Sequence, residues 1–479
     1  MKKIMTRLLS LVLLGTFIPS FVLAADWDLD KGSITVSATV ESQTVSQAGG
    51  SPTVDHNPVI TSSSGTTNNT VTITAEKNAT ANVTLENVNI DTGKTGGAAI
   101  TASGEGNVNI ELDGTNRVQS GNTHAGVEKK DNGTLTITDE DKDGSLTANG
   151  GGVGGAGIGG GYGGSGSNIT IEGGKVTATG DSAGAGIGGG AGGSGSNIAV
   201  SGGEVTAQGG FDGAGIGGGA GGSGSNITIS DGKVTATGGG AGAGIGGGYK
   251  GSGSGITIEG GEVTAQGDIG GAGIGGGVNG TGSDVTISGD AQVKVQGGAA
   301  NKNWHKGAAI GNGGTRTTDG NEVSPNTSDL TVEGFIQIYE PGKNINTDTP
   351  DRTIEGQKGD HSWNAGEVTT AERVPESKAA AYWVSDPEGQ SIPYQAQQKD
   401  GVLTVTVQAD TASLRGTTGS LGQLEAQGIA EIRFVTNGAQ SAFTLADLLA
   451  SGTGSFALTH EAEAVRFTLA GKDISGILK

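Results

Sequence analysis

The segment Gly-Ala-Gly-Ile-Gly-Gly-Gly recurs with a period of 29 residues, and its isoleucines are Ile158, Ile187, Ile216, Ile245 and Ile274. Each repeat holds three short apolar stretches that alternate with period two, as β-strands do, and glycine and serine runs separate them. One such unit cannot bury its apolar side alone, so each strand must pair in parallel with its equivalent in the next repeat. The repeats over residues 155–299 therefore predict an all-β fold, a parallel β-helix.

Stacking at this period places equivalent side chains in columns along the predicted helix. The isoleucine, valine and alanine columns fit a narrow apolar interior. A column of asparagines predicts a ladder of side-chain hydrogen bonds: Asn168, Asn197 and Asn226. Another column alternates in sign, which predicts control of register because a slip by one repeat would stack like charges: Lys175, Glu204, Lys233 and Glu262.

Weaker strand signals extend the helix on both sides of the repeats. They begin near Val71 and end near Tyr339, which predicts about eight to ten coils within residues 25–340. Residues 25–70 are expected to cap one end of the helix, because an open end would recruit other chains.

A change of composition marks a second part of the chain. The segment 341–377 is polar and contains three prolines, so it is predicted to be an extended connector. From residue 378 to 479 glycine is no longer dominant, and leucine and phenylalanine return. This pattern predicts a small α+β module with helices at residues 419–427 and 442–450.

The composition excludes several classes of protein. Glycine accounts for 97 of the 479 residues, but the glycines follow no every-third pattern and prolines number only 9, so the chain is not collagen-like. The net charge of -21 gives no basic footprint for nucleic acid or an anionic membrane.

The first residues predict the compartment. Lys2, Lys3 and Arg7 precede an apolar run that ends in small residues, which is typical of a secretory signal peptide over residues 1–24. No second apolar run approaches the length of a membrane span, so we expect no membrane insertion of the mature chain. The protein is therefore expected to be secreted or retained at the cell surface.

Catalytic and metal-binding patterns are sparse. The five histidines are scattered and the repeats hold no arginine, so the sequence predicts no enzyme. The nearest approach to a mixed polar site is His124 with Lys129, Lys130 and Asp131, which we interpret as a loop cluster. The acidic segment 139–143 offers hard oxygen ligands, which makes calcium a candidate metal ion.

Flat aromatic side chains beside hydrogen-bonding groups are typical of small-molecule and sugar sites. Tyr162 and Tyr249 share a column three coils apart, and each is followed ten residues later by an acid, Glu172 and Glu259. Trp304, on the irregular coil before the last Ala-Ile segment, is a further candidate. These five residues are the predicted ligand-binding residues.

Three segments resemble a known family: residues 82–90, residues 97–100, and the repeated Gly-Ala-Gly-Ile-Gly-Gly-Gly followed by Asn-Ile-Thr-Ile. They are similar to the secreted bacterial carbohydrate-binding β-helix family, which resembles pectate lyases in fold. The resemblance covers about residues 30–340. It implies a right-handed β-helix without lyase activity that binds cellulose-like and acidic plant polysaccharides, with bound calcium. It assigns no calcium ligand or sugar contact to a particular residue.

These features predict a secreted, non-enzymatic protein that binds extracellular polysaccharide of the cellulose or pectin type. The alternative is a structural or adhesive bacterial surface repeat protein with a protein partner, bound through the C-terminal module. A degradative lyase is the third reading. Only the first predicts affinity for glycans without turnover.

Overall fold

The computed structural model describes residues 26–315, 330–339, 343, 350–355, 370–375, 380–461 and 464–479. The expected signal peptide, residues 1–24, lies outside the described residues, and so does most of the expected connector. In the described ranges, no helix is long and apolar enough to span a membrane.

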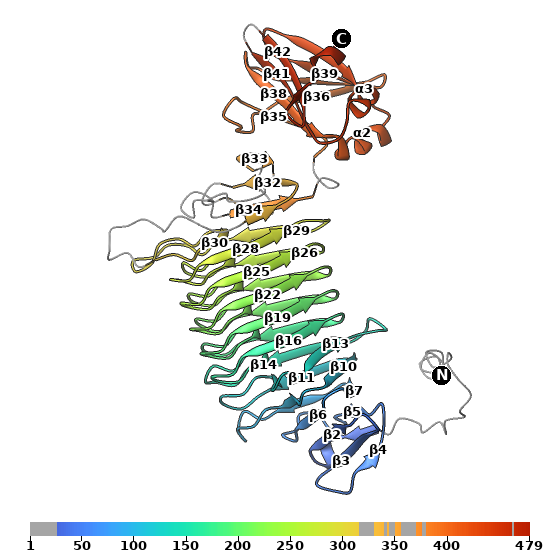
Figure 1. Cartoon of the computed structure of the whole chain (residues 1–479), viewed down its shortest axis with the longest axis vertical. Coiled ribbons are helices and arrows are strands. Elements are labelled where there is room, and N and C mark those ends of the chain that lie inside the picture. Colours follow the sequence, from blue (N-terminus) through green and yellow to red (C-terminus); the bar gives the residue numbers. More distant parts are fainter. Residues whose placement is uncertain are drawn as a thin grey trace, which may run out of the picture.

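The first part of the chain winds as a right-handed parallel β-helix, which confirms the predicted fold class (Figure 1). Each regular coil gives one strand to each of three sheets, A, B and C. Sheet A contains eleven parallel strands: β1 (Asp26–Asp28), β5 (Val59–Thr61), β7 (Thr80–Glu86), β10 (Asn107–Asp113), β13 (Thr134–Thr138), β16 (Gly166–Ile171), β19 (Gly195–Val200), β22 (Gly224–Ile229), β25 (Gly253–Ile258), β28 (Gly282–Ile287) and β31 (Leu330–Val332).

Sheets B and C complete the coils. The parallel strands of sheet B are β2 (Ile34–Ala38), β6 (Val71–Ala75), β9 (Ile100–Ser103) and β12 (Val127–Lys129), followed by the short Ile-Gly strands β15 (Ile158–Gly159), β18 (Ile187–Gly188), β21 (Ile216–Gly217), β24 (Ile245–Gly246), β27 (Ile274–Gly275) and β30 (Ile310–Gly311). The parallel strands of sheet C are β8 (Asn89–Asp91), β11 (Thr115–Gln119), β14 (Ser145–Asn149), β17 (Lys175–Thr179), β20 (Glu204–Gln208), β23 (Lys233–Thr237), β26 (Glu262–Gln266) and β29 (Gln292–Gln296).

The predicted columns are confirmed. Ile158 and its four equivalents are 0% exposed, and each of the first four pairs with the isoleucine 29 positions later. In the asparagine ladder, the amide of Asn197 donates to Asn168 over 3.0 Å, and that of Asn226 donates to Asn197 over 3.2 Å. The charged column pairs in the expected register, and Lys175 Nζ lies 3.3 Å from a carboxylate oxygen of Glu204.

Glycine is required where the sheet B strands turn toward sheet A. Gly217 has φ of +134°, and a Cβ there would lie 2.0 Å from the carbonyl oxygen of Gly246 in the next coil. The equivalent glycines of the neighbouring coils share this conformation and this close approach. No residue with a Cβ fits at this column in the regular repeats, because the carbonyl oxygen of the next coil occupies the position of the Cβ.

The N-terminal residues are less of a cap than the sequence suggests. β1 and β5 already belong to sheet A, and β2 pairs in parallel with β6, so sheet A has more strands than the eight to ten coils expected. The closing elements are β3 (Gln43–Gln47) and β4 (Thr53–Val54), which add to sheet B in antiparallel direction. The apolar alternation of residues 34–38 is the reason that this segment continues the helix.

The far end of the helix is covered by part of the segment expected to be a connector. β34 (Thr370–Val374) pairs antiparallel with β29 at the edge of sheet C. β32 (Phe335–Ile338) and β33 (Arg352–Glu355) extend this edge, also in antiparallel direction. The guanidinium of Arg373 donates to the carbonyl oxygens of Glu333, Ala291 and Gly289, which fixes β34 on the last coils.

The C-terminal module has its own core and two sheets (Figure 1). One sheet contains β35 (Trp383–Ser385), β38 (Ala412–Thr417), β41 (Ser455–Glu461), β42 (Ala464–Leu469) and β43 (Lys472–Asp473). The other contains β36 (Gln395–Lys399), β37 (Val402–Thr406), β39 (Glu431–Val435) and β40 (Gln440–Thr444). The helices α2 (Gly422–Ala426) and α3 (Leu445–Ala450) are shorter than expected, because residues 418–420 form a separate 3-10 turn and residues 442–444 belong to β40.

Candidate binding surface on the glycine-rich loops

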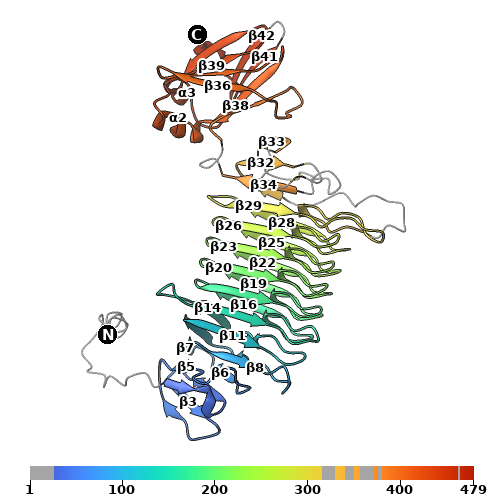
Figure 2. The ribbon, with the colours of Figure 1, turned by 180° about the vertical axis from the view of Figure 1, so that it is seen from behind.

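Each regular coil has two glycine-rich loops on the same side of the helix. The first loop joins sheet C to sheet B, as in residues 209–215, and the second joins sheet B to sheet A, as in residues 247–252. The backbone N–H of Tyr249 in a second loop donates to the carbonyl of Asp212 in a first loop over 2.8 Å, and Ala220 bonds Ala183 in the same way over 2.7 Å. The two sets of loops therefore form one stacked surface, the loop ridge, which projects from one side of the helix (Figures 1 and 2).

The aromatic side chains of residues 100–315 all lie on this loop ridge. They are Tyr162, Phe211, Tyr249 and Trp304. Tyr162 is 63% exposed and Phe211 is 75% exposed, and the other two are half-buried. Large exposed apolar side chains that gather on one face of a soluble protein mark an interaction surface.

Tyr249 and Trp304 form a cluster that the sequence alone did not predict. Their ring centroids are 5.9 Å apart in an edge-to-face arrangement, and Lys250 Nζ lies 5.0 Å from the Tyr249 centroid. The side chain of Asn301 accepts the backbone N–H of Trp304 over 2.9 Å, which holds the tryptophan loop in place. Phe211 is next to this cluster, because its neighbour Asp212 accepts the Tyr249 N–H.

The two predicted acids do not share a site with the tyrosines. Glu172 lies at the corner after β16, whereas Tyr162 lies in the loop before it, and Glu259 and Tyr249 are separated in the same way by β25. A strand of this length spans about 17 Å. Glu172 and Glu259 therefore lie on the opposite corner of the helix, and the interpretation that paired them with Tyr162 and Tyr249 is wrong.

A groove of about 610 Å³, lined by both apolar and polar groups, lies beside Tyr162. Its lining brings Tyr162 together with His124, Lys129, Lys130 and Asp131, which the sequence analysis had treated as a separate loop cluster. The groove therefore joins an exposed aromatic ring to a set of hydrogen-bonding and charged groups.

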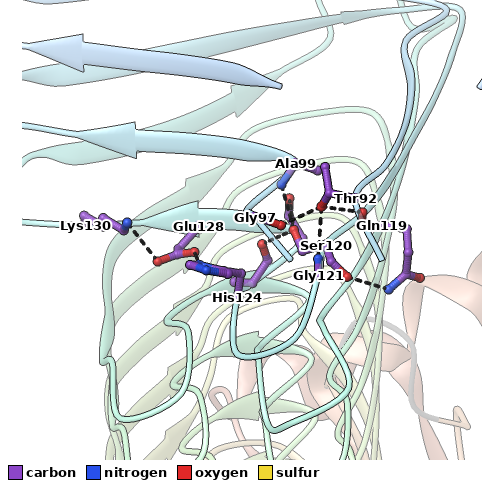
Figure 3. Close-up of polar contacts among 11 residues, drawn as sticks. Thr92, Gly97, Ala99, Gln119, Ser120, Gly121, His124, Glu128 and Lys130 are labelled. Atoms are coloured by element: carbon purple, nitrogen blue, oxygen red, sulfur yellow. Dashed lines mark hydrogen bonds and ion pairs between the residues drawn. The ribbon is translucent and has the colours of Figure 1, made fainter. Parts of the chain in front are cut away.

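Glu128 is the central residue of the groove and was missed in the sequence. Its carboxylate lies 2.5 Å from His124 Nδ1 and 3.2 Å from Lys130 Nζ, so both oxygens are engaged (Figure 3). The residue is only 6% exposed. Glu128 pairs with Gly159, so it stands in a column where the regular repeats have glycine. On its other side Glu128 pairs with Thr101, so the glycine column begins only at Gly159, and the acid directly before that column is the signal that identifies it.

Buried hydroxyls hold the loop that carries His124. Ser120 donates to the carbonyl of Ala125 over 2.6 Å and accepts the N–H of Ala99 over 2.8 Å (Figure 3). Lys129 is buried below the groove, where its Nζ donates to the carbonyls of Lys130 and Asp131 over 2.8 and 3.0 Å. Burial lowers the pKa of the Lys129 ammonium group. Both acceptors are backbone carbonyls, so Lys129 holds the backbone of residues 130 and 131 at the groove.

Comparison with known proteins supports the architecture. The beta helix repeat family matches four segments of the regular repeats, residues 169–191, 198–220, 227–249 and 256–278. The chain is a parallel β-helix repeat protein. No curated protein and no solved structure matches it significantly.

The acidic segment of this β-helix protein gathers more carboxylates than the sequence indicated. Two overlapping groups place carboxylate oxygens within 4.8 Å of one another: Glu111, Asp139 and Asp141, and Asp113, Asp141 and Asp143. Burial, together with the hydrogen bond and charge of Asp143, raises the pKa of Asp141. Oxygen groups of this kind suit a hard cation such as calcium.

The pairing of β10 with β13 explains the two residues of this cluster that were not predicted. Glu111 and Asp113 belong to β10, and Glu111 pairs with Thr138 at the end of β13. Glu140 lies outside both groups, and its backbone N–H donates to the carboxylate of Glu111 over 2.8 Å. Only the coil register, which is irregular here, brings these acids together.

Proposed function

We propose that this β-helix protein is a secreted, non-enzymatic protein that binds extracellular polysaccharide through the loop ridge. The observation that carries the proposal is that the exposed Tyr162 ring lines one groove together with the polar side chains of His124, Glu128 and Lys130. Sugars present apolar faces and a rim of hydroxyls, so an aromatic ring beside fixed polar groups suits them. The Tyr249 and Trp304 cluster supplies a second surface of the same kind.

The arrangement of charges supports binding rather than catalysis. The two oxygens of Glu128 are engaged by His124 and Lys130, so this carboxylate orients its neighbours. A glycosidase needs a pair of carboxyl groups on either side of the scissile bond. The groove lining as described holds one other carboxylate, Asp131, and it also accepts a hydrogen bond within the protein, from the backbone N–H of Gly104 over 3.0 Å.

The test uses the full chain from residue 25 and a panel of insoluble polysaccharides that includes cellulose and pectin. We expect selective retention of the wild type, and a loss of at least about tenfold in affinity for the double variant Tyr162→Ala and Tyr249→Ala. Both substitutions place alanine where the same column already has Ala191 and Ala220, so the fold should be kept. Release of sugar products would contradict the non-enzymatic part, and no retention would overturn the proposal.

The C-terminal module favours a second candidate, a structural or adhesive surface protein with a protein partner. All five residues of the edge strand β36, Gln395–Lys399, are exposed. An exposed edge strand can pair with a strand of another protein. Under this candidate, a chain that ends at residue 377 would lose its association with cells, and its affinity for glycans would be the same as that of the full chain.

A further inference from the structure

The two aromatic positions on the loop ridge belong to one continuous column. Gly163 N–H, next to Tyr162, donates to the carbonyl of Ala191 over 2.7 Å. The same bond recurs from Gly192 to Ala220 over 2.8 Å and from Gly221 to Tyr249 over 2.8 Å. The tyrosines are therefore three coils apart on a rigid stack, a separation of about 14 Å.

The surface between the tyrosines is low and polar. The column holds the small side chains of Ala191 and Ala220 there. In the neighbouring first loop, the hydroxyl of the exposed Ser182 donates to the carbonyl of Gly152 over 3.1 Å. The residue before Ser182, Asp181, is partly exposed. A ligand that lies over both rings can cross this low surface and meet polar groups on the way.

Each end of the low surface has a distinct aromatic station. The first station is Tyr162 with the groove of His124 and Lys130. The second station is Tyr249 with Trp304 at 5.9 Å, with the exposed Phe211 on the adjoining loop. The stations are not copies of one another, because the first is bordered by a groove of polar and charged side chains and the second by further aromatic rings together with Lys250.

We propose that the loop ridge holds one extended, linear polysaccharide chain along the helix axis, seated on both stations at once. The inference rests on the proposed function and specifies its ligand as the interior of a long chain, not a single sugar or a chain end. Successive coils rise by about 4.8 Å. This rise is close to the advance per residue of an extended 1→4-linked glycan, so sugar residues about three apart along the chain meet the two stations.

Two stations on one rigid stack have a measurable consequence. Once a glycan chain is seated on one station, the second contact becomes intramolecular, and affinity rises without any new type of contact. Glycans too short to span the stations bind through one station only. Affinity should therefore rise steeply at the chain length that first reaches both.

The experiment measures the affinity of the full chain for cello-oligosaccharides and for oligogalacturonides, from dimer to octamer, by titration calorimetry. We expect weak binding of the dimer and trimer and an increase on the order of 10²-fold for longer chains of one series. Tyr162→Ala or Tyr249→Ala alone should abolish this increase while leaving the weak binding of short chains through the remaining station. Glu172→Ser, which copies Ser201 of the same column and lies on the opposite corner of the helix, is the matched control and should keep the increase.

A spacing variant distinguishes the two-station inference from the proposed function. A second copy of residues 163–220, inserted after Ala220, moves the stations two coils further apart and preserves the alternation of the charged column. We expect the chain length needed for tight binding to increase by about two sugar residues. An unchanged length dependence, or equal affinity from dimer to octamer, would overturn the inference while leaving glycan binding intact. No binding of any oligosaccharide or polymer would overturn both and favour a protein ligand.

Discussion

The regular repeats and the C-terminal module bury their apolar residues in different ways. In the repeats, every buried isoleucine contacts its equivalent one coil away, and the interior is built from aliphatic columns. In the module, Phe443 packs against Phe467 with ring centroids 4.6 Å apart and against Phe456 at 5.9 Å. The helix therefore distributes its stability over many similar coils, whereas the module depends on one central cluster.

The largest loss of stability should come from a substitution in the phenylalanine cluster of the module. Phe443 is 0% exposed and touches two other rings, so Phe443→Ala should lower the free energy of unfolding of the module by about 3–5 kcal/mol. Denaturant unfolding of the full chain should then show the module transition at lower denaturant and the helix transition unchanged. Leu449→Ala, on the exposed face of α3, is the control and should change little. A parallel loss in the helix would mean that the two cores are not independent.

In the repeats, the largest loss of stability should come from replacing a glycine whose backbone closely approaches the next coil. Gly217→Ala forces an alanine to φ of +134° and places its Cβ 2.0 Å from Gly246 O, so we expect a loss of about 3 kcal/mol or more in the free energy of unfolding. Gly97→Ala, where a Cβ meets open space, should stay within about 0.5 kcal/mol. Urea unfolding of both variants checks this difference, and equal stabilities would refute the role assigned to the close approach.

The two regions should also respond differently to pH. His460 of the module is buried, with Nδ1 3.1 Å from the Thr436 hydroxyl and Nε2 3.0 Å from the Ser441 hydroxyl. Burial lowers its pKa below 6.5, so the folded module prefers the neutral ring. This contribution is complete above pH 6.5 and is lost as pH falls below that value, because the unfolded chain then takes up the proton more readily.

Module stability, followed from neutral pH to about pH 5, tests this effect. His460→Gln, which keeps a hydrogen-bonding side chain, should remove the dependence on pH in this range. The repeats over residues 155–299 contain no histidine, so their transition is the internal reference. A wild-type module whose stability does not fall relative to the repeats would contradict the assignment to His460.

The period of 29 residues made the regular coils predictable, because equivalent positions can be aligned without knowing the structure. Outside the repeats the alignment fails. Glu128 was missed because the coils around it differ in length, and the contact between Tyr249 and Trp304 was missed because Ile274 pairs with Ile310 across a longer coil. The pairing of Tyr162 with Glu172 was wrong because spacing along the sequence ignored the strand between them.

The module was less predictable for a different reason. Its strand pairs join segments that are distant in sequence, such as β38 with β41, and no periodicity indicates the register. The return of leucine and phenylalanine indicated a separate core, but the shared packing of Phe443, Phe456 and Phe467 depends on the fold itself. Local patterns predict elements well, whereas a non-repeating core must be read from the structure.

The smallest loss of stability is expected in the asparagine ladder. It distinguishes the contribution of the side-chain hydrogen bonds from that of the backbone conformation. Asn197 has φ of 52° and is exposed, so its side-chain bonds to Asn168 and Asn226 compete with water. Asn197→Ala should cost about 1–2 kcal/mol, from the lost bonds together with the strain of a positive φ. Asn197→Gly removes the side-chain hydrogen bonds but introduces no strain, because glycine readily adopts a positive φ and Gly255 already does so in this column. The free energy of unfolding should therefore fall by only about 0.5 kcal/mol. Equal losses for alanine and glycine in urea unfolding would assign the effect to the hydrogen bonds. The expected difference assigns it to the backbone: in this column the asparagine is favoured chiefly because it tolerates a positive φ, and the loss stays small because it touches one coil of many.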